Sequence, residues 1–414
     1  MTKYTIKSPA KLNATVALPA SKSISNRSLI IYALSGGGMM PQNLSDCDDT
    51  NVIVDAIRYM PEVIDIKAAG TAMRFMTAYL SVMRGTHTLT GTERMKHRPI
   101  RVLVDALRQL GANIEYAGEE GFPPLRITGR RLTGGTLEMP GNVSSQYISA
   151  VLMIGPVLAE GLELKLTGDI ISRPYIDLTL WVMREFGADA EWSAGDTISV
   201  KPKPYRNREY LIENDWSGAS YWYEMVALSK DRDATIRLSG LMDGSKQGDS
   251  VVKYIFSLLG VKTVFESKET GRPQTVTLKK SGRCVPRLEY DFVNSPDLAQ
   301  TFVVCCCMMG VPFHFRGLAT LKIKETDRIK ALMTEMLKLG FVLQSKNDSE
   351  LIWDGTRCEP EQDCAIDTYE DHRMALSFAP ASMCQPLTIN NPQVVTKSYP
   401  RFWDDLQDAG FEIQ

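Results

Sequence analysis

The sequence lacks an excess of charge of either sign and any long apolar run. Its 414 residues include 47 lysines and arginines and 49 aspartates and glutamates, giving a formal net charge of −2. Proteins that bind nucleic acids usually carry a basic excess, so this balance argues against a DNA or RNA partner. No apolar stretch reaches the roughly 20 residues that span a bilayer. The N-terminal residues show neither a secretion signal nor an Arg-rich transit pattern, so we expect a cytoplasmic protein.

The motifs of metal, nucleotide and disulfide chemistry are also lacking. Eight cysteines occur without a C-x-x-C pair, and three of them, Cys305 to Cys307, are consecutive in an apolar helical pattern. This predicts reduced, buried cysteines. The four histidines have no metal-ligand spacing, and no G-x-S-x-G, Walker A or G-x-G-x-x-G motif is present. We therefore expect no metal and no cofactor, and chemistry that comes from acid–base groups with cationic stabilisation.

What the chain does contain is one repeated local pattern. An amphipathic helical segment ends in a large apolar residue or alanine followed by glycine, and alternating strand residues come next. A sixth, weaker copy begins at Asp49 and has lost its glycine, whereas the glycines of the five clear copies are Gly111, Gly187, Gly260, Gly340 and Gly410. The repetition favours several α/β units in closed or pseudo-symmetric domains, although such segments occur in any α/β protein. A Pro- and charge-rich segment, 201–214, predicts a linker between two halves.

Strongly basic residues stand in separate motifs along this neutral chain. They are Lys22, Arg27, Arg98, Lys324, Arg328, Arg373 and Lys397. Local cations in a neutral protein predict a focused pocket for a small polyanion.

Several polar motifs share a position at the N-terminal end of an apolar helical pattern. Unpaired N–H groups and the positive end of the helix dipole make such positions suitable for anions. Ordinary N-capping explains each motif taken alone, and an anion site is favoured only by the group together. The motifs are Lys22-Ser23, Ala69-Gly-Thr71, Ser144-Ser-Gln146 and Pro296-Asp297.

Two carboxylates are candidate acid–base groups. Lys324 and Arg328 are spaced i, i+4 and are predicted to share a helix face, with Glu325 pointing away from that face as a candidate acid. Asp297 is the second candidate because it stands alone beside an apolar helix. An exposed helix with ordinary ion pairs and a capping role for Asp297 remain alternatives. His372 is a possible base, although its neighbour Arg373 makes a structural role equally reasonable.

These residues give the chain a resemblance to the 5-enolpyruvylshikimate-3-phosphate (EPSP) synthase family over nearly its full length. Any one motif alone is weak, and their combination in this order is highly specific. The motifs that carry the resemblance are Leu18–Arg27, Ala69–Arg74, Arg94–Ile100, Val143–Gln146, Ile171–Tyr175, Gln247–Asp249, Pro296–Asp297, Lys324–Arg328, Asp371–Met374 and Thr396–Lys397.

The resemblance implies an α/β fold of two pseudo-threefold domains, each of three βαβαββ units around parallel helices, as in an inside-out α/β barrel. Residues 1–20 and 214–414 would form a discontinuous domain and 21–213 an inserted second domain, with the active site in the cleft between them. It also implies transfer of the carboxyvinyl group of phosphoenolpyruvate to the 5-hydroxyl of shikimate 3-phosphate, within aromatic amino-acid biosynthesis. The expected partners are these small molecules, without a nucleic acid or membrane, and the expected state is a monomer.

Roles for individual residues follow from the resemblance. Asp297 would be the base on the 5-hydroxyl, Glu325 the acid on the methylene carbon, and Lys22 would contact both substrates. Shikimate 3-phosphate would be held by Lys22, Ser23, Arg27, Ser144, Ser145, Gln146, Ser172, Tyr175, Asp297, Thr320 and Lys324. Phosphoenolpyruvate would be held by Lys22, Gly70, Arg98, Gln146, Arg328, Arg373 and Lys397.

The chain departs from the family pattern in a few places. The segment from Asp49 to Gly70 is shorter than usual, which predicts one shortened repeat that has lost a helix or a strand. Ala68, Phe75 and Thr320 replace the residues usual at their positions, so substrate affinity and sensitivity to inhibitors such as glyphosate stay open. The related UDP-N-acetylglucosamine enolpyruvyl transferases use a cysteine in the region of 85–98, and this chain has none there. A non-catalytic protein that keeps the anion pocket is a further alternative.

Overall fold

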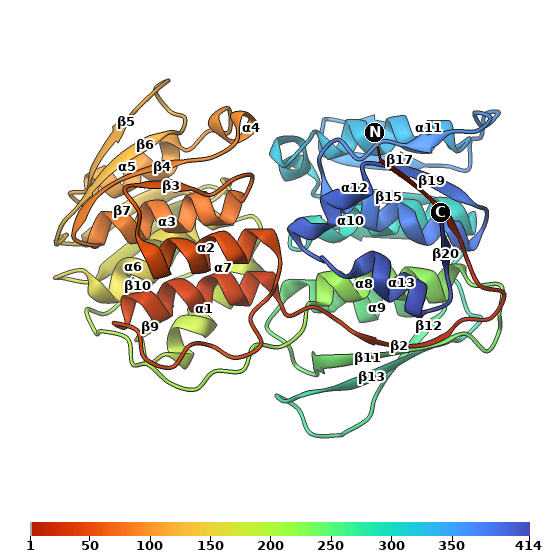
Figure 1. Cartoon of the computed structure of the whole chain (residues 1–414), viewed down its shortest axis with the longest axis horizontal. Coiled ribbons are helices and arrows are strands. Elements are labelled where there is room, and N and C mark those ends of the chain that lie inside the picture. Colours follow the sequence, from red (N-terminus) through yellow and green to blue (C-terminus); the bar gives the residue numbers. More distant parts are fainter. Residues whose placement is uncertain (1) are drawn as a thin grey trace. The chain divides into compact units, whose positions relative to one another are not determined.

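The chain folds into two compact units, each with its own hydrophobic core. The structure, a computed structural model, describes residues 2–414. Unit 1 comprises Met1–Pro19 and Glu213–Gln414, and unit 2 comprises Ala20–Ile212. The chain therefore passes from one unit to the other twice, at 19–20 and at 212–213. Figure 1 shows both units as mixtures of helices and strands.

Unit 1 is built from three βαβαββ repeats. The first consists of β2 (Asn13–Ala17), α8 (Trp216–Leu228), β11 (Thr235–Met242), α9 (Val252–Leu258), β12 (Val261–Phe265) and β13 (Pro273–Lys280). The second consists of β14 (Leu288–Asp291), α10 (Ala299–Met309), β15 (Phe313–Arg316), α11 (Arg328–Lys338), β16 (Gln344–Lys346) and β17 (Glu350–Trp353). The third consists of β18 (Ala365–Ile366), α12 (His372–Phe378), β19 (Leu387–Asn390), α13 (Phe402–Asp408), β20 (Glu412–Ile413) and, from the N-terminus, β1 (Lys3–Lys7).

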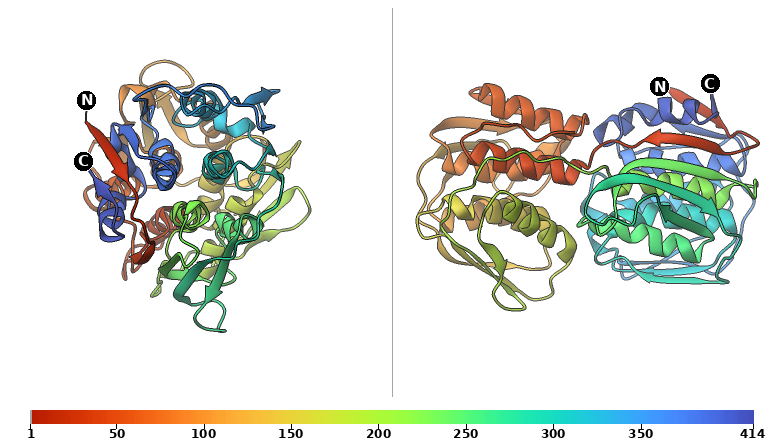
Figure 2. Two further views of the ribbon diagram at one scale, coloured as in Figure 1. Left: turned by 90° about the vertical axis from the view of Figure 1, so that its right-hand side faces the viewer. Right: turned by 90° about the horizontal axis from the view of Figure 1, so that it is seen from below.

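Each repeat of unit 1 forms its own four-stranded sheet with the same topology. The strand orders in unit 1 are β2-β11-β13-β12, β14-β15-β17-β16 and β18-β19-β1-β20. In every sheet the first two strands are parallel and the other pairs are antiparallel, as a helical crossover followed by a hairpin requires. Figure 2 (left) looks along the helices of unit 1 and shows the strands at their periphery.

Unit 2 contains two complete repeats and one shortened repeat. The complete ones are β3 (Val63–Asp65), α3 (Gly70–Val82), β4 (Gly85–Thr90), α4 (Glu93–Lys96), α5 (Arg101–Gln109), β5 (Asn113–Tyr116) and β6 (Leu125–Gly129), followed by β7 (Gly135–Pro140), α6 (Ser145–Ile154), β8 (Leu162–Thr167), α7 (Arg173–Glu185), β9 (Ala190–Trp192) and β10 (Thr197–Val200). Their sheets have the orders β3-β4-β6-β5 and β7-β8-β10-β9.

The shortened repeat keeps both of its helices and loses its sheet. It comprises α1 (Lys22–Leu34), α2 (Asp48–Tyr59) and a single bridge between Gln42 and Leu211. Within residues 2–414 no four-stranded sheet is built from this repeat. The sequence predicted the loss of a helix or a strand, and the structure shows that strands were lost.

The two helices of a repeat differ in burial because their sequences differ. The first helix, such as α8, α10 or α3, is apolar nearly all round and is buried along most of its length. The second, such as α5, α7 or α11, has a charged outer face and a buried inner one. Cys305, Cys306 and Cys307 on α10 are free and fully buried, as predicted. Cys284 and Cys358 are free but exposed, and Cys364 and Cys384 are only partly buried, so the prediction of burial was wrong for these four.

The second helices end as the glycine pattern predicted. Gly111, Gly187, Gly260, Gly340 and Gly410 all have positive φ, between 83° and 99°, in the left-handed region that ends a helix. In the shortened repeat the equivalent position after α2 is Met60, with φ of 40° and ψ of 54°. Met60 therefore adopts the left-handed conformation, in which the Cβ of a non-glycine residue crowds the backbone.

Candidate functional site

Three cationic side chains converge on the carboxylate of Asp297 in unit 1. Asp297 lies in the short 3-10 helix η3 (Pro296–Leu298), just before α10. Arg328, the first residue of α11, donates from Nη1 to Oδ1 at 2.9 Å. Arg373, from α12, donates from Nη2 to Oδ2 at 3.3 Å, and Lys324 Nζ lies 3.4 Å from Oδ1. Asp297 therefore forms ion pairs and does not cap its helix.

A second carboxylate, Glu325, shares Arg328 with Asp297. Arg328 donates from Nη2 to Glu325 Oε2 at 2.9 Å. Lys397, at the end of η6 (Pro392–Lys397), donates to Glu325 Oε1 at 2.8 Å. The sequence prediction that Glu325 points away from Arg328 was wrong, because α11 begins only at Arg328, with Asp327 as its N-cap. Lys324 and Glu325 precede the helix, so the i, i+4 helical spacing does not apply to them.

Asp371 completes this network and was not predicted as a site residue. It is fully buried and accepts from Arg328 Nε at 2.7 Å and Nη2 at 3.3 Å. It is also the N-cap of α12, because it accepts from the backbone N–H of Arg373 at 2.9 Å. One carboxylate thus fixes the guanidinium of Arg328 and the start of the helix that carries Arg373. The sequence signal, an aspartate before a helix, indicated only a cap.

The network holds Asp297 and Arg328 ionised. Burial alone would raise the pKa of Asp297, but the nearby charges of Arg373, Lys324 and Arg328 outweigh burial and hold that pKa well below its usual range. Burial would lower the pKa of Arg328, and the carboxylates of Asp371, Glu325 and Asp297 instead raise it above its usual value. Four cations, Lys397 included, surround three carboxylates, so the cluster keeps an excess of positive charge for an anionic ligand.

Two further side chains of unit 1 lie at or beside this network. Tyr221, on α8, accepts a hydrogen bond at 3.4 Å through its hydroxyl oxygen from Arg373 Nη1 and is buried. The predicted ligand Thr320 lies in η4 (Ala319–Ile323), and its buried Oγ1 has no hydrogen-bond partner among the described residues. A buried hydroxyl that is free to donate and accept suits the ligand role predicted for Thr320.

In unit 2 the candidate residues lie at the N-terminal ends of α1, α3, α6 and α7. Contacts between these helices join residues at similar depths. Arg27, the sixth residue of α1, donates to Thr179, the seventh of α7, and to Ser149, the fifth of α6. Gln146 and Thr71, the second residues of α6 and α3, are hydrogen-bonded at 3.3 Å. The first turns of α3 and α6 therefore lie together. Those of α1 and α7 do so too, because Arg27 donates to the carbonyls of both Ser23 and Tyr175. The positive dipole ends of each pair of helices are thus gathered.

Arg27 forms more hydrogen bonds within the protein than the sequence suggested. Its Nε donates to Thr179 Oγ1 at 2.7 Å, Nη1 to the Ser23 carbonyl at 2.9 Å, and Nη2 to both Ser149 Oγ and the Tyr175 carbonyl at 3.3 Å. It is 3% exposed, and burial lowers its pKa to about 10. At most one of its five N–H donors is left for a ligand. Phe75, one of the unusual residues, lies beneath the guanidinium, 5.4 Å from Cζ to the ring centroid.

The other predicted residues of unit 2 occupy the first turns of these helices. Lys22 opens α1 and lies 3.4 Å from Asp49 Oδ2 on α2, and Ser23 follows it. Ser144 caps α6 and accepts from the Gln146 N–H, with Ser145 as the first helical residue. Ser172, at φ of 54°, precedes α7, and Tyr175 lies in its first turn. Ala68 is exposed just before α3.

Gly70, the first residue of α3, is surrounded by guanidinium groups. A Cβ at this position would stand 2.7 Å from Nη1 of Arg74 and 2.7 Å from Nη1 of Arg98. Any side chain here would displace both guanidinium groups from the start of α3. Arg98 and Gln146 were predicted together with Gly70, and the structure brings the three to the start of α3 and α6.

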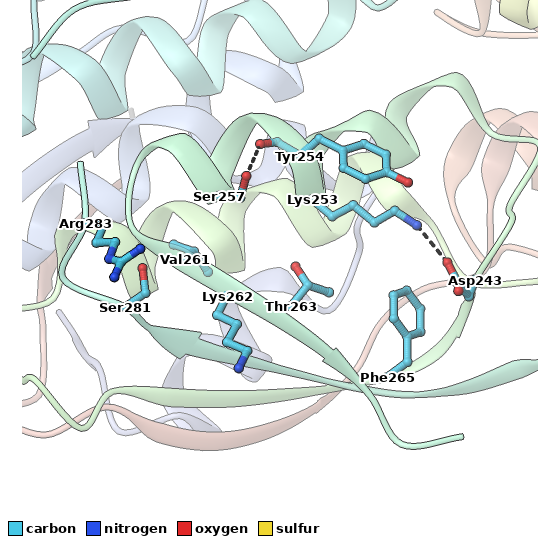
Figure 3. A pocket seen from close by; sticks show the side chains of 10 residues that line it. All are labelled: Asp243, Lys253, Tyr254, Ser257, Val261, Lys262, Thr263, Phe265, Ser281 and Arg283. Carbon is cyan, nitrogen blue, oxygen red and sulfur yellow. Dashed lines mark hydrogen bonds and ion pairs between the residues drawn. The ribbon is translucent and has the colours of Figure 1, made fainter. Parts of the chain in front are cut away.

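A hollow elsewhere in unit 1 has none of these features. It lies between α9 and β12, has a volume of about 650 Å³, and shares no residue with the predicted site. Lys253 within it is already paired with Asp243 at 2.9 Å. Figure 3 shows Lys262 pointing away from both Lys253 and Arg283, so these cations do not converge on one ligand position.

The described residues, 2–414, include no group of histidine, cysteine or acidic side chains arranged to hold a metal ion. None of the helices in this range has the length and hydropathy needed to cross a bilayer.

Comparison with known proteins agrees with this geometry. The family model described as EPSP synthase (3-phosphoshikimate 1-carboxyvinyltransferase) matches residues 6–62 and 59–406. The chain belongs to the EPSP synthase family. It is 60% identical over 413 residues to the 3-phosphoshikimate 1-carboxyvinyltransferase of Bacteroides fragilis, covering 100% of this chain and 99% of the relative. A protein of the same name from Photobacterium profundum is 32% identical, with 99% of both chains covered.

Two solved structures share the fold. The EPSP synthase of Acinetobacter baumannii superposes with a TM-score of 0.80 at 22% identity, covering 100% of both chains. The enolpyruvyl transferase NikO from Streptomyces tendae superposes with a TM-score of 0.74 at 16% identity, covering 100% of this chain and 98% of that one. The predicted fold, with one shortened repeat, is therefore confirmed. The sheets of residues 2–414 remain separate and do not close into one hydrogen-bonded barrel.

Proposed function

We propose that this chain transfers the carboxyvinyl group of phosphoenolpyruvate to the 5-hydroxyl of shikimate 3-phosphate and releases phosphate. The observation that carries the proposal is the pair of carboxylates, Asp297 and Glu325, that share Arg328 within a cluster of four cations. Binding an anion requires cations alone, whereas proton transfer at two points of a substrate requires two acid–base groups. The name shared by the full-length relatives in Bacteroides and Photobacterium supports the same reaction.

The two units contribute different groups to this reaction. Unit 1 supplies Asp297, Glu325, Thr320 and the cations Lys324, Arg328, Arg373 and Lys397, and unit 2 supplies Lys22, Arg98 and the helix N-termini. Phosphoenolpyruvate carries a carboxylate and a phosphate group, and forked guanidinium donors suit both. The proposal requires the two sets of side chains to act on the same pair of substrates, with phosphoenolpyruvate held by residues of both units.

Proton movements balance over two steps. Asp297 takes the proton of the 5-hydroxyl as the oxygen bonds to C2 of phosphoenolpyruvate, while protonated Glu325 gives a proton to the methylene carbon. The resulting tetrahedral adduct then loses phosphate, as Glu325 recovers its proton from the methyl group and Asp297 returns one to the leaving group. Substrate anions that engage Arg328 and Arg373 raise the pKa of Asp297 from its depressed value, because they offset the cations that lower it. Asp297 thus becomes a stronger base when the substrates are bound.

The test is phosphate release from phosphoenolpyruvate, with shikimate 3-phosphate as acceptor and UDP-N-acetylglucosamine in a parallel reaction. We expect release with shikimate 3-phosphate alone. Release with the sugar nucleotide would assign the chain to the related transferase, against which the absence of cysteine in 85–98 argues. Release with neither acceptor, from folded protein, would favour an anion-binding protein without catalysis. We also propose a monomer, since one chain supplies every implied residue, and analytical ultracentrifugation tests this oligomeric state. A cytoplasmic location stays a proposal from the N-terminal sequence.

A further inference from the structure

An arginine outside the residues implied by the resemblance, Arg74, lies beside the start of α3. Its Nη1 donates to the Gly70 carbonyl at 2.8 Å, and its guanidinium lies over the ring of Tyr147, with Cζ 5.7 Å from the centroid. The residue is 5% exposed, and its buried Nε has no hydrogen-bond partner. No carboxylate within residues 2–414 forms an ion pair with it. A buried cation without a counter-charge in the protein is unfavourable unless a ligand supplies that charge.

A second guanidinium reaches the same point. The Nη1 atoms of Arg74 and Arg98 both lie 2.7 Å from the position that a Cβ on Gly70 would take. Two like charges this close repel each other. The helix that begins there adds positive potential, because its N-cap, Ala69, has no side chain that could accept from the first-turn N–H groups. Three independent sources of positive potential thus meet at one point, which is the arrangement that an anion stabilises.

We propose that Arg74 is a positioning residue that adds a second guanidinium to the anion subsite already expected at Arg98 and the first turn of α3. This rests on the proposed function, in which the anion is the phosphate group of phosphoenolpyruvate and leaves as inorganic phosphate. Arg74 adds charge beside the ligand and fixes the Gly70 carbonyl, so the N–H groups of the first turn stay directed toward the anion. Arg98 makes the direct contact.

The experiment titrates inorganic phosphate and phosphoenolpyruvate into the protein by calorimetry, with shikimate 3-phosphate present. Arg74→Gln is expected to weaken both by about 10- to 100-fold, because it removes a positive charge a few ångströms from the anion. Arg74→Lys keeps the positive charge but lacks the planar guanidinium with its several N–H donors. We expect it to lose up to about tenfold in affinity for both anions. Arg108→Gln is the matched control, because Arg108 also donates to a carbonyl, that of Ile114, and lies over a ring, that of Tyr116.

Wild-type phosphate affinity in Arg74→Gln would overturn the proposal. If that variant does not fold, unchanged phosphate affinity in Arg74→Lys would overturn it equally. An equal loss in Arg108→Gln would show that the effect is general destabilisation, and would also overturn it. The subsite and the proposed function fail separately. If the wild-type protein shows no transfer activity but Arg74→Gln weakens its phosphate binding, the subsite stands and the proposed function fails. If the wild-type protein shows full transfer and Arg74→Gln leaves phosphate affinity unchanged, only the subsite fails.

Discussion

Unit 1 covers its helices with three four-stranded sheets, and unit 2 covers its helices with two. The repeat that lost its sheet, α1 with α2, kept the helix N-termini that carry Lys22, Ser23, Arg27 and Asp49. The retained helices carry candidate substrate-binding side chains, whereas the lost sheet would only have covered the helices. In this fold the N-terminal ends of the helices therefore supply the candidate site. A sheet buries one side of the helices and can be lost without losing those ends.

The surface of unit 2 differs where the sheet is missing. All of its exposed large apolar side chains among the described residues belong to the shortened repeat or to the segments next to it: Met39, Met40, Tyr59, Val63 and Leu211. Met60, in the left-handed position after α2, belongs to the same region. Exposed apolar side chains and a helix end with a non-glycine residue in the left-handed conformation therefore occur together where the sheet is absent.

The largest expected effect separates the units by chemistry. Asp297→Asn should lower turnover by roughly 10²- to 10⁴-fold, because it removes the proposed base of unit 1 while substrates still bind. Steady-state phosphate release measures it, with folded protein verified by thermal melting. Asp367→Ala is the control, since Asp367 pairs with Lys338 at 2.9 Å outside the site. Near-normal turnover in Asp297→Asn would remove Asp297 as the base.

The second prediction is that the stability of unit 1 depends on pH through Glu213. Glu213, 3% exposed and bonded to Ser245 at 2.6 Å, has its pKa raised to about 7 by burial. The folded state therefore binds this proton more tightly than the unfolded chain, whose pKa is near 4.5. Stability from this group is complete below about pH 4.5 and is lost as pH rises to about 7, by up to about 3 kcal/mol.

Hydrogen exchange resolved along the chain measures this loss. Protection of unit 1 should fall more between pH 5 and 7 in the wild type than in Glu213→Gln, which cannot ionise, while unit 2 serves as the internal reference. Glu224, whose pKa burial also raises, belongs to unit 1 as well and is unchanged in the comparison. The same pH slope in both proteins would contradict a stabilising protonated Glu213.

The smallest expected effect compares a complete helix end with the shortened one. Met60→Gly should stabilise the protein by about 0.5–1 kcal/mol, because glycine adopts the left-handed conformation without a Cβ clash. Gly111→Ala should destabilise it by about 1 kcal/mol for the same reason, since a Cβ there meets no atom within 4 Å and the effect is purely conformational. Denaturant unfolding measures both. Destabilisation by Met60→Gly would show that the methionine side chain contributes more packing than its backbone conformation costs.

The sequence predicted most of the fold because the second helix of each repeat carries its own stop signal. A glycine after an apolar helix residue is a local requirement of the left-handed position, so Gly111 and its four equivalents could be identified without tertiary information. The sequence did not show whether a helix or strands had been lost after Asp49, because α2 remains amphipathic and only the length of the segment was informative.

The site was predicted less completely, and for a physical reason. Asp371 and Arg74 act through contacts with residues distant in sequence or at a helix start, where an aspartate indicates a cap and an arginine indicates solvent. The orientation of Glu325 was predicted wrongly because α11, capped by Asp327, begins at Arg328, four residues later than the i, i+4 pattern assumed. Such errors concern local boundaries, which tertiary packing decides.

The proposed function requires residues of both units to hold one substrate. The most direct measurement titrates phosphoenolpyruvate by calorimetry, with shikimate 3-phosphate present, into Arg98→Ala from unit 2 and Arg373→Ala from unit 1. We expect each variant to lose at least about tenfold in phosphoenolpyruvate affinity, with a much smaller loss for shikimate 3-phosphate in Arg98→Ala. Wild-type phosphoenolpyruvate affinity in either variant, or equal losses for both substrates in Arg98→Ala, would contradict the account.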